Sequence, residues 1–394
     1  MSRILFLFVF YILHVWFFVD YFFYGIDYTE FLGSVQSYTY GYQIAVLSFG
    51  YILACFTFLI IGLYAKPIHL PFAFINPDRV VNLNRLFSGF RISMTVCICF
   101  MASLLSQAGA QIASSEFKES NNWIYEFRIL PLIFLSFILL NGYRLKRIDK
   151  LLICIYASIA MLGLTRSLIV ELFSIFFFYY ALYLKNDKLK IEYVVITFLG
   201  IIFINIMASF RETTSWDAVI DNASALFAFE YKSYLDLQIS EVIQNYNERG
   251  YYTFIDSSIL IIPSFIRELF GIKMFYPDQE LFFEIGRRSY PYYGGGFSLL
   301  AEAYLNLKYL APILFLFIGY IINIVLISIK KSKAMNRFTV NAVFPLMIIS
   351  IILSFRNGFS IHFKYVIQLY ILAFLTFFFV TKKRKPHFVR PPKI

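Results

Sequence analysis

Charged residues are scarce in this sequence, where Asp, Glu, Lys and Arg together make up only 15% of 394 residues. Soluble globular proteins average about 25% charged and about 45–50% apolar residues, whereas 60% of this chain is hydrophobic. The shortage of charge excludes a soluble enzyme and a disordered tail. Cysteine is scarce too: there are four, all in apolar runs and without a CxxC pair, which excludes a disulfide scaffold. We expect all four to be small buried hydrophobic residues in a protein whose solvent is lipid.

Several catalytic motifs are also missing. The sequence contains no phosphate loop ending in GK[ST], no HExxH, no His/Cys cluster and no G-x-S-x-G. Asp27 and Glu30 form a carboxylate pair of the kind that a metal-dependent sugar transferase uses, but two acids near a membrane surface are common. We therefore expect no metal and no cofactor.

Long hydrophobic runs are what the sequence has in abundance. A helix needs about 20 apolar residues, with a range of about 17–25, to cross the hydrocarbon core of a bilayer. Ten runs approach this length and predict an all-α polytopic membrane protein with about ten transmembrane helices. The runs are Ile4–Tyr24, Tyr42–Tyr64, Ile92–Gln107, Phe127–Tyr143, Leu151–Leu164, Leu168–Leu184, Ile191–Phe210, Tyr309–Ile329, Phe338–Phe355 and Tyr365–Thr381.

The placement of basic residues agrees with this count. The net charge of +11 could suggest nucleic acid in a soluble protein, but here the basic residues cluster in alternate loops, as the positive-inside rule requires of cytoplasmic segments. With both ends cytoplasmic, residues 1–210 form a bundle of about seven spans and residues 309–381 about three. The basic tail, residues 382–394, is expected to contact anionic lipid head groups.

The apolar run from Leu151 to Leu184 is interrupted only at residues 165–167. A single helix of this length would measure about 51 Å, at 1.5 Å per residue, which is too long for the bilayer. Two spans that meet at Arg166 fit better.

Residues 211–308 differ in composition and form one large outer loop, with 8 basic and 13 acidic residues. Asp217–Tyr246 is predicted to form one or two amphipathic helices. Ile255–Phe270 is too short to span and carries Pro263, so it suits a re-entrant or interfacial helix. A turn-rich stretch with three glycines, residues 294–296, precedes a predicted helix at Phe297–Asn306.

Arginines at or just beyond the outer membrane surface are the main candidates for ligand binding. The guanidinium group binds phosphate with two parallel hydrogen bonds and stays charged at any relevant pH. The alternative is that these arginines pair with neighbouring acids or extend to lipid head groups. The candidates for pyrophosphate binding are Arg166, Arg211, Arg287, Arg288 and Arg356.

Two residues are the candidates for acid–base chemistry. His362 is predicted to lie in the late outer loop, where a neutral imidazole could take a proton from a sugar hydroxyl. Glu302 lies in the helix that follows the glycines. Glu171, shortly after Arg166, competes with them but could simply neutralise an arginine.

The run Gly294-Gly295-Gly296-Phe297-Ser298-Leu299-Leu300-Ala301-Glu302-Ala303-Tyr304-Leu305-Asn306 resembles the oligosaccharide repeat-unit polymerases, the Wzy-type polymerases of O-antigen and capsule. Thr165-Arg166-Ser167 between two short spans and the large outer loop late in the chain are similar to them as well. The resemblance implies a GT-C-like bundle in the bacterial cytoplasmic membrane. It also implies a glycosyltransferase that passes a chain on undecaprenyl pyrophosphate to a new lipid-linked repeat unit. Arginines would bind the pyrophosphates, with Glu302 and His362 as the catalytic candidates.

The partners implied are the undecaprenyl-pyrophosphate-linked oligosaccharide, membrane lipids and a chain-length-regulating membrane protein, with no nucleic acid. Two alternatives stay open. One is a flippase for lipid-linked oligosaccharides, although such transporters usually have two similar halves and short loops. The other is a metal-dependent transferase using a polyprenyl-phosphate sugar, which would need Asp27.

Overall fold

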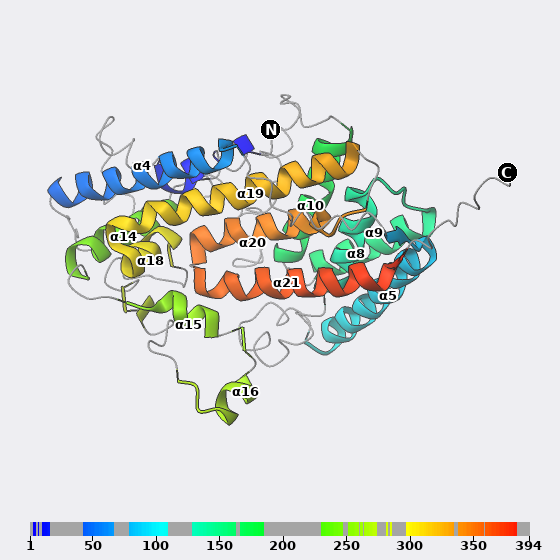
Figure 1. The fold of residues 1–394 in the computed structure, drawn as a ribbon. Helices are drawn as coiled ribbons and strands as arrows, with labels where there is room; N and C mark the ends of the chain where they lie inside the picture. The colour runs from blue at the N-terminus through cyan, green and yellow to red at the C-terminus, as the bar shows by residue number, and fades with distance from the viewer. Residues whose placement is uncertain are drawn as a thin grey trace, which may run out of the picture. The chain divides into compact units, whose positions relative to one another are not determined.

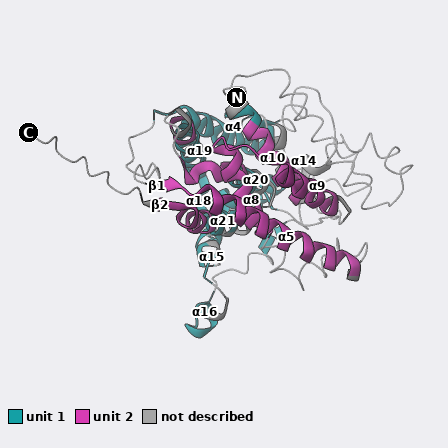
Figure 2. Cartoon of the chain, turned by 90° about the vertical axis from the view of Figure 1, so that its right-hand side faces the viewer, with its two compact units in different colours: residues 1–69, 180–327, 346–369 teal, residues 70–179, 328–345, 370–394 magenta. Residues whose placement is uncertain are grey.

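The computed structural model describes most of the predicted helices. It describes residues 3, 4, 7 and 10–15 near the N-terminus. It also describes residues 42–66, 79–108, 128–162, 166–184, 230–246, 251–273 and 281–285 (the last two with single gaps), 297–334, 338–357 and 359–383. Contacts divide the chain into two compact units (Figure 2). Unit 1 contains residues 1–69, 180–327 and 346–369, and unit 2 contains residues 70–179, 328–345 and 370–394.

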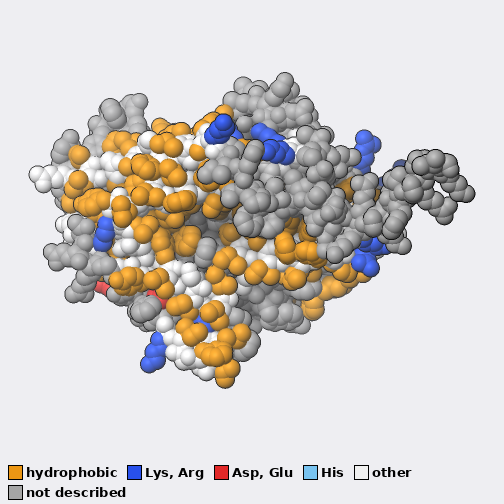
Figure 3. Space-filling model, in the orientation of Figure 1, with side chains coloured by type: hydrophobic (Ala, Val, Ile, Leu, Met, Phe, Trp, Pro, Cys, Tyr) orange, Lys and Arg blue, Asp and Glu red, His pale blue; other side chains and the backbone are white. Residues whose placement is uncertain are grey.

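The described part of the chain is mostly helical, and its helices are apolar. Among the described residues, three helical stretches are long and apolar enough to cross a membrane: Gln43–Tyr64, Leu83–Ser106 and Leu299–Lys331. Shorter apolar helices occur at Ile129–Leu140, Leu168–Leu182, Val340–Ile351 and Tyr365–Val380. Large apolar side chains are exposed along these helices (Figure 3). Exposed apolar surface on this scale is what lipid contact requires, so the chain is a membrane protein.

Unit 1 contains helix α4 (Tyr42–Tyr64), the helices of the large loop and most of α19 (Ala311–Ala334), which lies beside α4 (Figure 1). The two helices touch at glycines, because a Cβ on Gly62 would lie 2.2 Å from the Leu316 carbonyl oxygen. Small residues permit such close backbone approach between membrane helices. The loop helices are α14 (Glu230–Asn245), α15 (Thr253–Ile259), α16 (Ser264–Leu269) and α18 (Leu299–Leu307).

Unit 2 is built on four helices that pack against one another: α5 (Leu83–Ala108), α8 (Ile129–Leu140), α9 (Arg147–Leu162) and α10 (Arg166–Tyr179). A two-stranded antiparallel sheet joins β1 (Arg79–Val81) to β2 (Thr381–Lys383), with Val80 opposite Lys382. A short 3-10 helix, Val340–Val343, packs on α8, where the Ser136 hydroxyl donates to the Ala342 carbonyl oxygen. Helices α20 (Phe344–Asn357) and α21 (Phe359–Val380) each have residues in both units.

Several predicted spans match these helices. Helix α4 has the predicted bounds, and the long run from Leu151 to Leu184 forms two separate helices, α9 and α10, as predicted. The run Ile191–Phe210 and most of Ile4–Tyr24 lie outside the described residues. Cys55 and Cys97 are buried as expected, but the expectation is wrong for Cys99 and Cys154, which are exposed on apolar helices.

Several predicted boundaries are wrong. Helix α5 begins at Leu83, nine residues before the predicted Ile92, and α21 begins at Phe359 rather than Tyr365. The predicted interfacial helix Ile255–Phe270 is instead two short helices, α15 and α16. Pro263 precedes α16 and has no N–H to donate, so one continuous helix would lose a hydrogen bond there.

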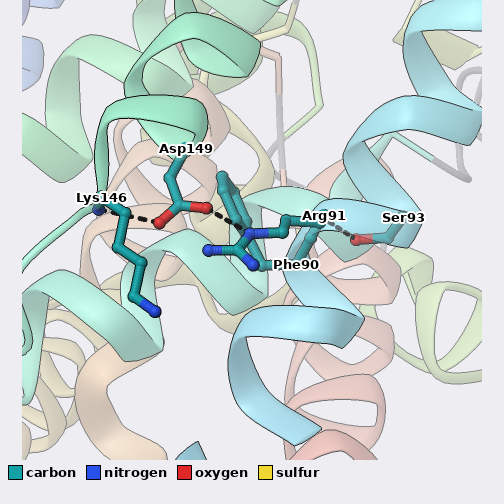
Figure 4. A network of polar contacts seen from close by, with 5 residues as sticks. All are labelled: Phe90, Arg91, Ser93, Lys146 and Asp149. Atoms are coloured by element: carbon teal, nitrogen blue, oxygen red, sulfur yellow. Dashed lines mark hydrogen bonds and ion pairs between the residues drawn. The ribbon is translucent and has the colours of Figure 1, made fainter. Parts of the chain in front are cut away.

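A buried ion pair fixes the first turn of α9 to α5 (Figure 4). Arg91 Nε donates to Asp149 Oδ1 at 2.7 Å, and the backbone N–H of Lys146 donates to Asp149 Oδ2 at 2.8 Å. Asp149 is fully buried, whereas 32% of the Arg91 side chain is exposed. This pair explains how α5 can begin before Arg91, because Asp149 of α9 neutralises the charge of Arg91 where the two helices meet.

We expect that Asp149→Asn lowers the free energy of unfolding. Breaking a fully buried pair costs about 3–5 kcal/mol, and the partial exposure of Arg91 should reduce this to about 2 kcal/mol. Thermal unfolding in detergent of Asp149→Asn, Arg91→Gln and the double variant gives the coupling energy. Strictly additive effects would contradict a direct interaction.

Candidate functional site

The candidate site in unit 1 is built around Glu302, which lies in the first turn of α18 and has no exposed surface. Thr253 Oγ1 donates a hydrogen bond to Glu302 Oε1 at 3.1 Å. The backbone N–H of Phe359, at the start of α21, donates to Glu302 Oε2. A single carboxylate thus joins α18 to the first residues of α15 and α21.

Asn306, one helical turn after Glu302, completes the network. Its Nδ2 donates to Thr253 Oγ1 at 2.7 Å and to the Glu302 carbonyl oxygen at 2.8 Å. Its Oδ1 accepts from the Phe254 N–H at 3.2 Å. The side chains of Glu302 and Asn306 therefore bind the free N–H groups at the beginnings of two helices, which is how side chains cap helix N-termini.

A carboxylate side chain suits this position. The N-terminus of α21 carries a partial positive charge, and a carboxylate next to it is stabilised. The rings of Phe254 and Phe359 pack edge to face with centroids 4.9 Å apart, which closes the apolar side of the junction.

Further hydrogen bonds hold α18 to the other helices of unit 1. Tyr51 Oη on α4 donates to the Leu300 carbonyl oxygen at 2.9 Å, and the Ser298 N–H donates to Gln238 Oε1 on α14 at 2.8 Å. The three elements α4, α14 and α18 are therefore connected through polar groups that are buried. Hydrogen bonds between buried groups are costly to break, so these bonds hold the three elements together.

Lys308 marks the change of direction between α18 and α19. Its φ of 51° lies in the left-handed region, which is uncommon for a residue other than glycine. Lys308 Nζ donates to the Tyr246 carbonyl oxygen at 2.5 Å and lies over the rings of Tyr251 and Tyr304. These contacts compensate the unfavourable backbone conformation and tie the end of α14 to the start of α19.

The hydrogen bond between Glu302 and the Phe359 N–H can hold the first turn of α21 in place. Both oxygens of Glu302 accept hydrogen bonds from protein donors, and the side chain is buried. This arrangement favours a positioning role for Glu302 over direct proton transfer to a substrate, which requires a carboxylate oxygen within reach of the reacting hydroxyl.

The other predicted site residues fall in different places. His362 lies in the first turn of α21, three residues after Phe359, and not in a loop; Arg356 lies in the last turn of α20. Both are therefore close in sequence to the residue that Glu302 binds. Arg166 is the first residue of α10, in unit 2. Arg211, Arg287 and Arg288 lie outside the described residues, as do Asp27 and Glu30.

Sequence reasoning missed Arg128, which precedes α8 in unit 2. Arg128 Nη2 lies 3.7 Å from Glu171 Oε1, and both side chains are largely buried. Arg128 was hidden in the predicted span Phe127–Tyr143, although its position at the very edge of that span was a usable signal. Thr253 and Asn306 were missed as well. The sequence offered a signal for Asn306 alone: it follows Glu302 by four residues, and this spacing puts the two side chains on one face of a helix.

Comparison with known proteins gives no match: no family model, no curated protein and no solved structure is similar to this chain. Within the part of the chain that the structure describes, no group of three or more His, Cys, Asp and Glu side chains could hold a metal ion.

Proposed function

We propose that this protein is a glycosyltransferase that polymerises lipid-linked oligosaccharide repeat units into O-antigen or capsular polysaccharide at the outer face of the bacterial cytoplasmic membrane. The acceptor hydroxyl of one repeat unit attacks the anomeric carbon of a chain carried on undecaprenyl pyrophosphate. The bond from that carbon to the phosphate oxygen breaks, a glycosidic bond forms, and the lipid pyrophosphate leaves. The hydroxyl proton passes to a base, for which His362 is the candidate.

The observation that carries this proposal is the buried network of Glu302, Thr253 and Asn306. It ties helices of the large loop to the start of α21, where His362 lies. A transferase with a lipid-linked substrate needs its reacting groups at the membrane edge, because the lipid tail stays in the bilayer while the pyrophosphate lies at the surface. A fixed junction between loop helices and a membrane helix suits that requirement.

Contacts within each unit support a topology of about ten spans with both ends cytoplasmic. In that topology α4 and α19 both run from the outer to the inner face. Their contacts agree with this common direction: Tyr51 in the middle of α4 donates to the Leu300 carbonyl oxygen, shortly before α19, and Asn323 Nδ2 of α19 donates to the Ala65 carbonyl oxygen, just after α4. In unit 2, strands β1 and β2 belong to two segments that the topology assigns to the cytoplasm, and they pair with each other.

The chemistry proposed for the arginines is electrostatic. Negative charge develops on the leaving pyrophosphate, and guanidinium groups held in place stabilise it without reorganising. The proposed pyrophosphate ligands are Arg166, Arg211, Arg287, Arg288 and Arg356.

The test is the length of polysaccharide in a deletion strain that carries single variants at equal protein levels. We expect Arg166→Ala, Arg288→Ala and His362→Ala to leave mostly single repeat units, since each removes a group from the reaction. Lys273→Ala is a matched control, because Lys273 is an exposed cation in the same large loop. Normal chain lengths in all three variants would overturn the site assignment. If the deletion strain accumulates repeat units at the inner face rather than single units at the outer face, the protein is a flippase instead.

A further inference from the structure

The strongest feature outside the proposed site is a group of cations in unit 2, where the start of α9 packs against α5. Figure 4 shows two of them, Arg91 and Lys146. Residues 141–151 contain four basic residues, Arg144, Lys146, Arg147 and Lys150, and a single acid, Asp149. All four basic side chains are exposed. Arg91 on α5 adds a fifth cation beside them through its bond to Asp149.

Asp149 does not neutralise this surface. It is fully buried, and its two oxygens are occupied by Arg91 Nε and by the backbone N–H of Lys146. One of five cations is therefore paired, and the other four keep their charge at the surface. Because no other acid occurs in residues 79–92 or 141–151, nothing in these two segments offsets that charge.

Arg91 also has an unused donor. Its Nη2 is buried and has no hydrogen-bond partner. A buried guanidinium nitrogen without an acceptor is costly, and a phosphate oxygen is the acceptor that matches its geometry best.

Exposed apolar side chains flank the cations. Ile92 is 65% exposed next to Arg91, and Ile148 and Leu151 are 53% and 59% exposed among the basic residues of α9. A small soluble anion would leave this apolar surface uncovered. A phospholipid covers it with acyl chains while its phosphate meets the cations.

We infer that Arg91, Arg144, Lys146, Arg147 and Lys150, which together we call the inner basic surface, bind the headgroup phosphate of an anionic phospholipid. The proposed topology puts this surface at the cytoplasmic face, where anionic lipids attract basic residues next to membrane helices. The inference does not depend on the polymerase reaction, and the surface would anchor the start of α9 and α5 at a fixed depth in the membrane.

The experiment uses the purified full-length protein in a neutral detergent. Binding of phosphatidylglycerol is measured by native mass spectrometry and by the rise in the thermal unfolding midpoint, with phosphatidylcholine and inorganic phosphate as parallel additions. We expect phosphatidylglycerol to bind and stabilise the protein, the other two to do so weakly, and 0.5 M NaCl to reduce the effect by screening.

The variant that tests the surface is the triple substitution Lys146→Gln, Arg147→Gln and Lys150→Gln. It leaves the Asp149 hydrogen bonds intact, because Lys146 contributes only its backbone N–H. Each cation contributes about fivefold to binding of anionic lipid, so the triple variant should bind phosphatidylglycerol about 100-fold more weakly. Arg91→Lys keeps the charge but loses the forked donors, and it should weaken binding by less.

The control is Lys273→Gln, which removes an exposed cation in the large outer loop. Its lipid binding should equal that of the wild type. The proposal is overturned if the triple variant binds phosphatidylglycerol as tightly as the wild type does. Equal stabilisation by phosphatidylcholine, or by inorganic phosphate, would overturn it as well.

Discussion

Gly62→Ala is expected to lower the stability of unit 1 sharply, because the new Cβ would lie 2.2 Å from the Leu316 carbonyl oxygen and 2.9 Å from the Tyr320 backbone nitrogen. Both neighbours are backbone atoms of α19, so no side chain can move aside. The helices must separate, and the contacts on either side of the crossing are lost with them. We expect a cost of about 3 kcal/mol, at the upper end of what overpacked cores show.

Gly319→Ala tests the same crossing from the other helix. Its Cβ would lie 2.5 Å from the Leu59 carbonyl oxygen and 2.9 Å from the Leu63 backbone nitrogen. The two substitutions disturb one interface, so the double variant should cost less than the sum of the single variants.

Gly50→Ala is the matched control in the same helix. A Cβ on Gly50 meets nothing within 4 Å, and alanine has the higher helix propensity, so this variant should be neutral or slightly more stable. The measurement is the fraction of monodisperse protein that survives heating in detergent, read by size-exclusion chromatography. If Gly62→Ala and Gly50→Ala lose protein at the same temperature, the close crossing does not exist.

The sequence was sufficient to predict where apolar helices lie and insufficient for several of their ends. Helix α4 has no charged residue in its run, so its bounds followed from composition alone. The start of α5 could not be found in this way, because Arg85 and Arg91 looked like the residues of a loop. Their charges are accommodated by partners far along the chain, Asp149 for Arg91 and the Phe379 carbonyl oxygen for Arg85.

The end of helix α8 could have been predicted from its turn residues, although hydropathy alone placed it too late. Helix α8 ends at Leu140, before the predicted Tyr143, because Gly142 adopts a φ of 82° and the Tyr143 N–H donates to the Ile138 carbonyl oxygen at 2.8 Å. This is the hydrogen-bond pattern of a helix that ends at a left-handed glycine. The Asn141-Gly142 pair is a sequence signal for such an end.

In the candidate site, by contrast, the sequence could not predict which residues contact one another. Glu302 was a candidate from the sequence, but its partners were not, because Thr253 lies 49 residues and Phe359 57 residues away in the chain. Only the fold brings them together. The same holds for His362, whose position in the first turn of α21 depends on where that helix begins.

Glu302→Ala is expected to abolish long polysaccharide chains and to destabilise unit 1. Alanine leaves the Thr253 hydroxyl and the Phe359 N–H without their acceptor in a buried place, and each such loss costs about 1–3 kcal/mol. Without the acceptor, the start of α21 is no longer held against α18, and His362 loses its fixed position. Ser258→Ala is a control in the adjoining helix α15, since the Ser258 side chain is exposed and donates only to the Phe254 carbonyl oxygen.

Glu302→Gln separates the two roles that remain open for this residue. The glutamine carbonyl oxygen can accept from the Phe359 N–H, and its amide can donate to Thr253 Oγ1, so the junction stays closed apart from the loss of one charge at the N-terminus of α21. If Glu302 positions α21, chains in this variant should approach wild-type length at equal protein levels. If Glu302 accepts the proton in the reaction, glutamine must be as inactive as alanine, because an amide cannot act as the base. A folded but inactive Glu302→Gln protein would therefore overturn the positioning role and make Glu302 a catalytic residue.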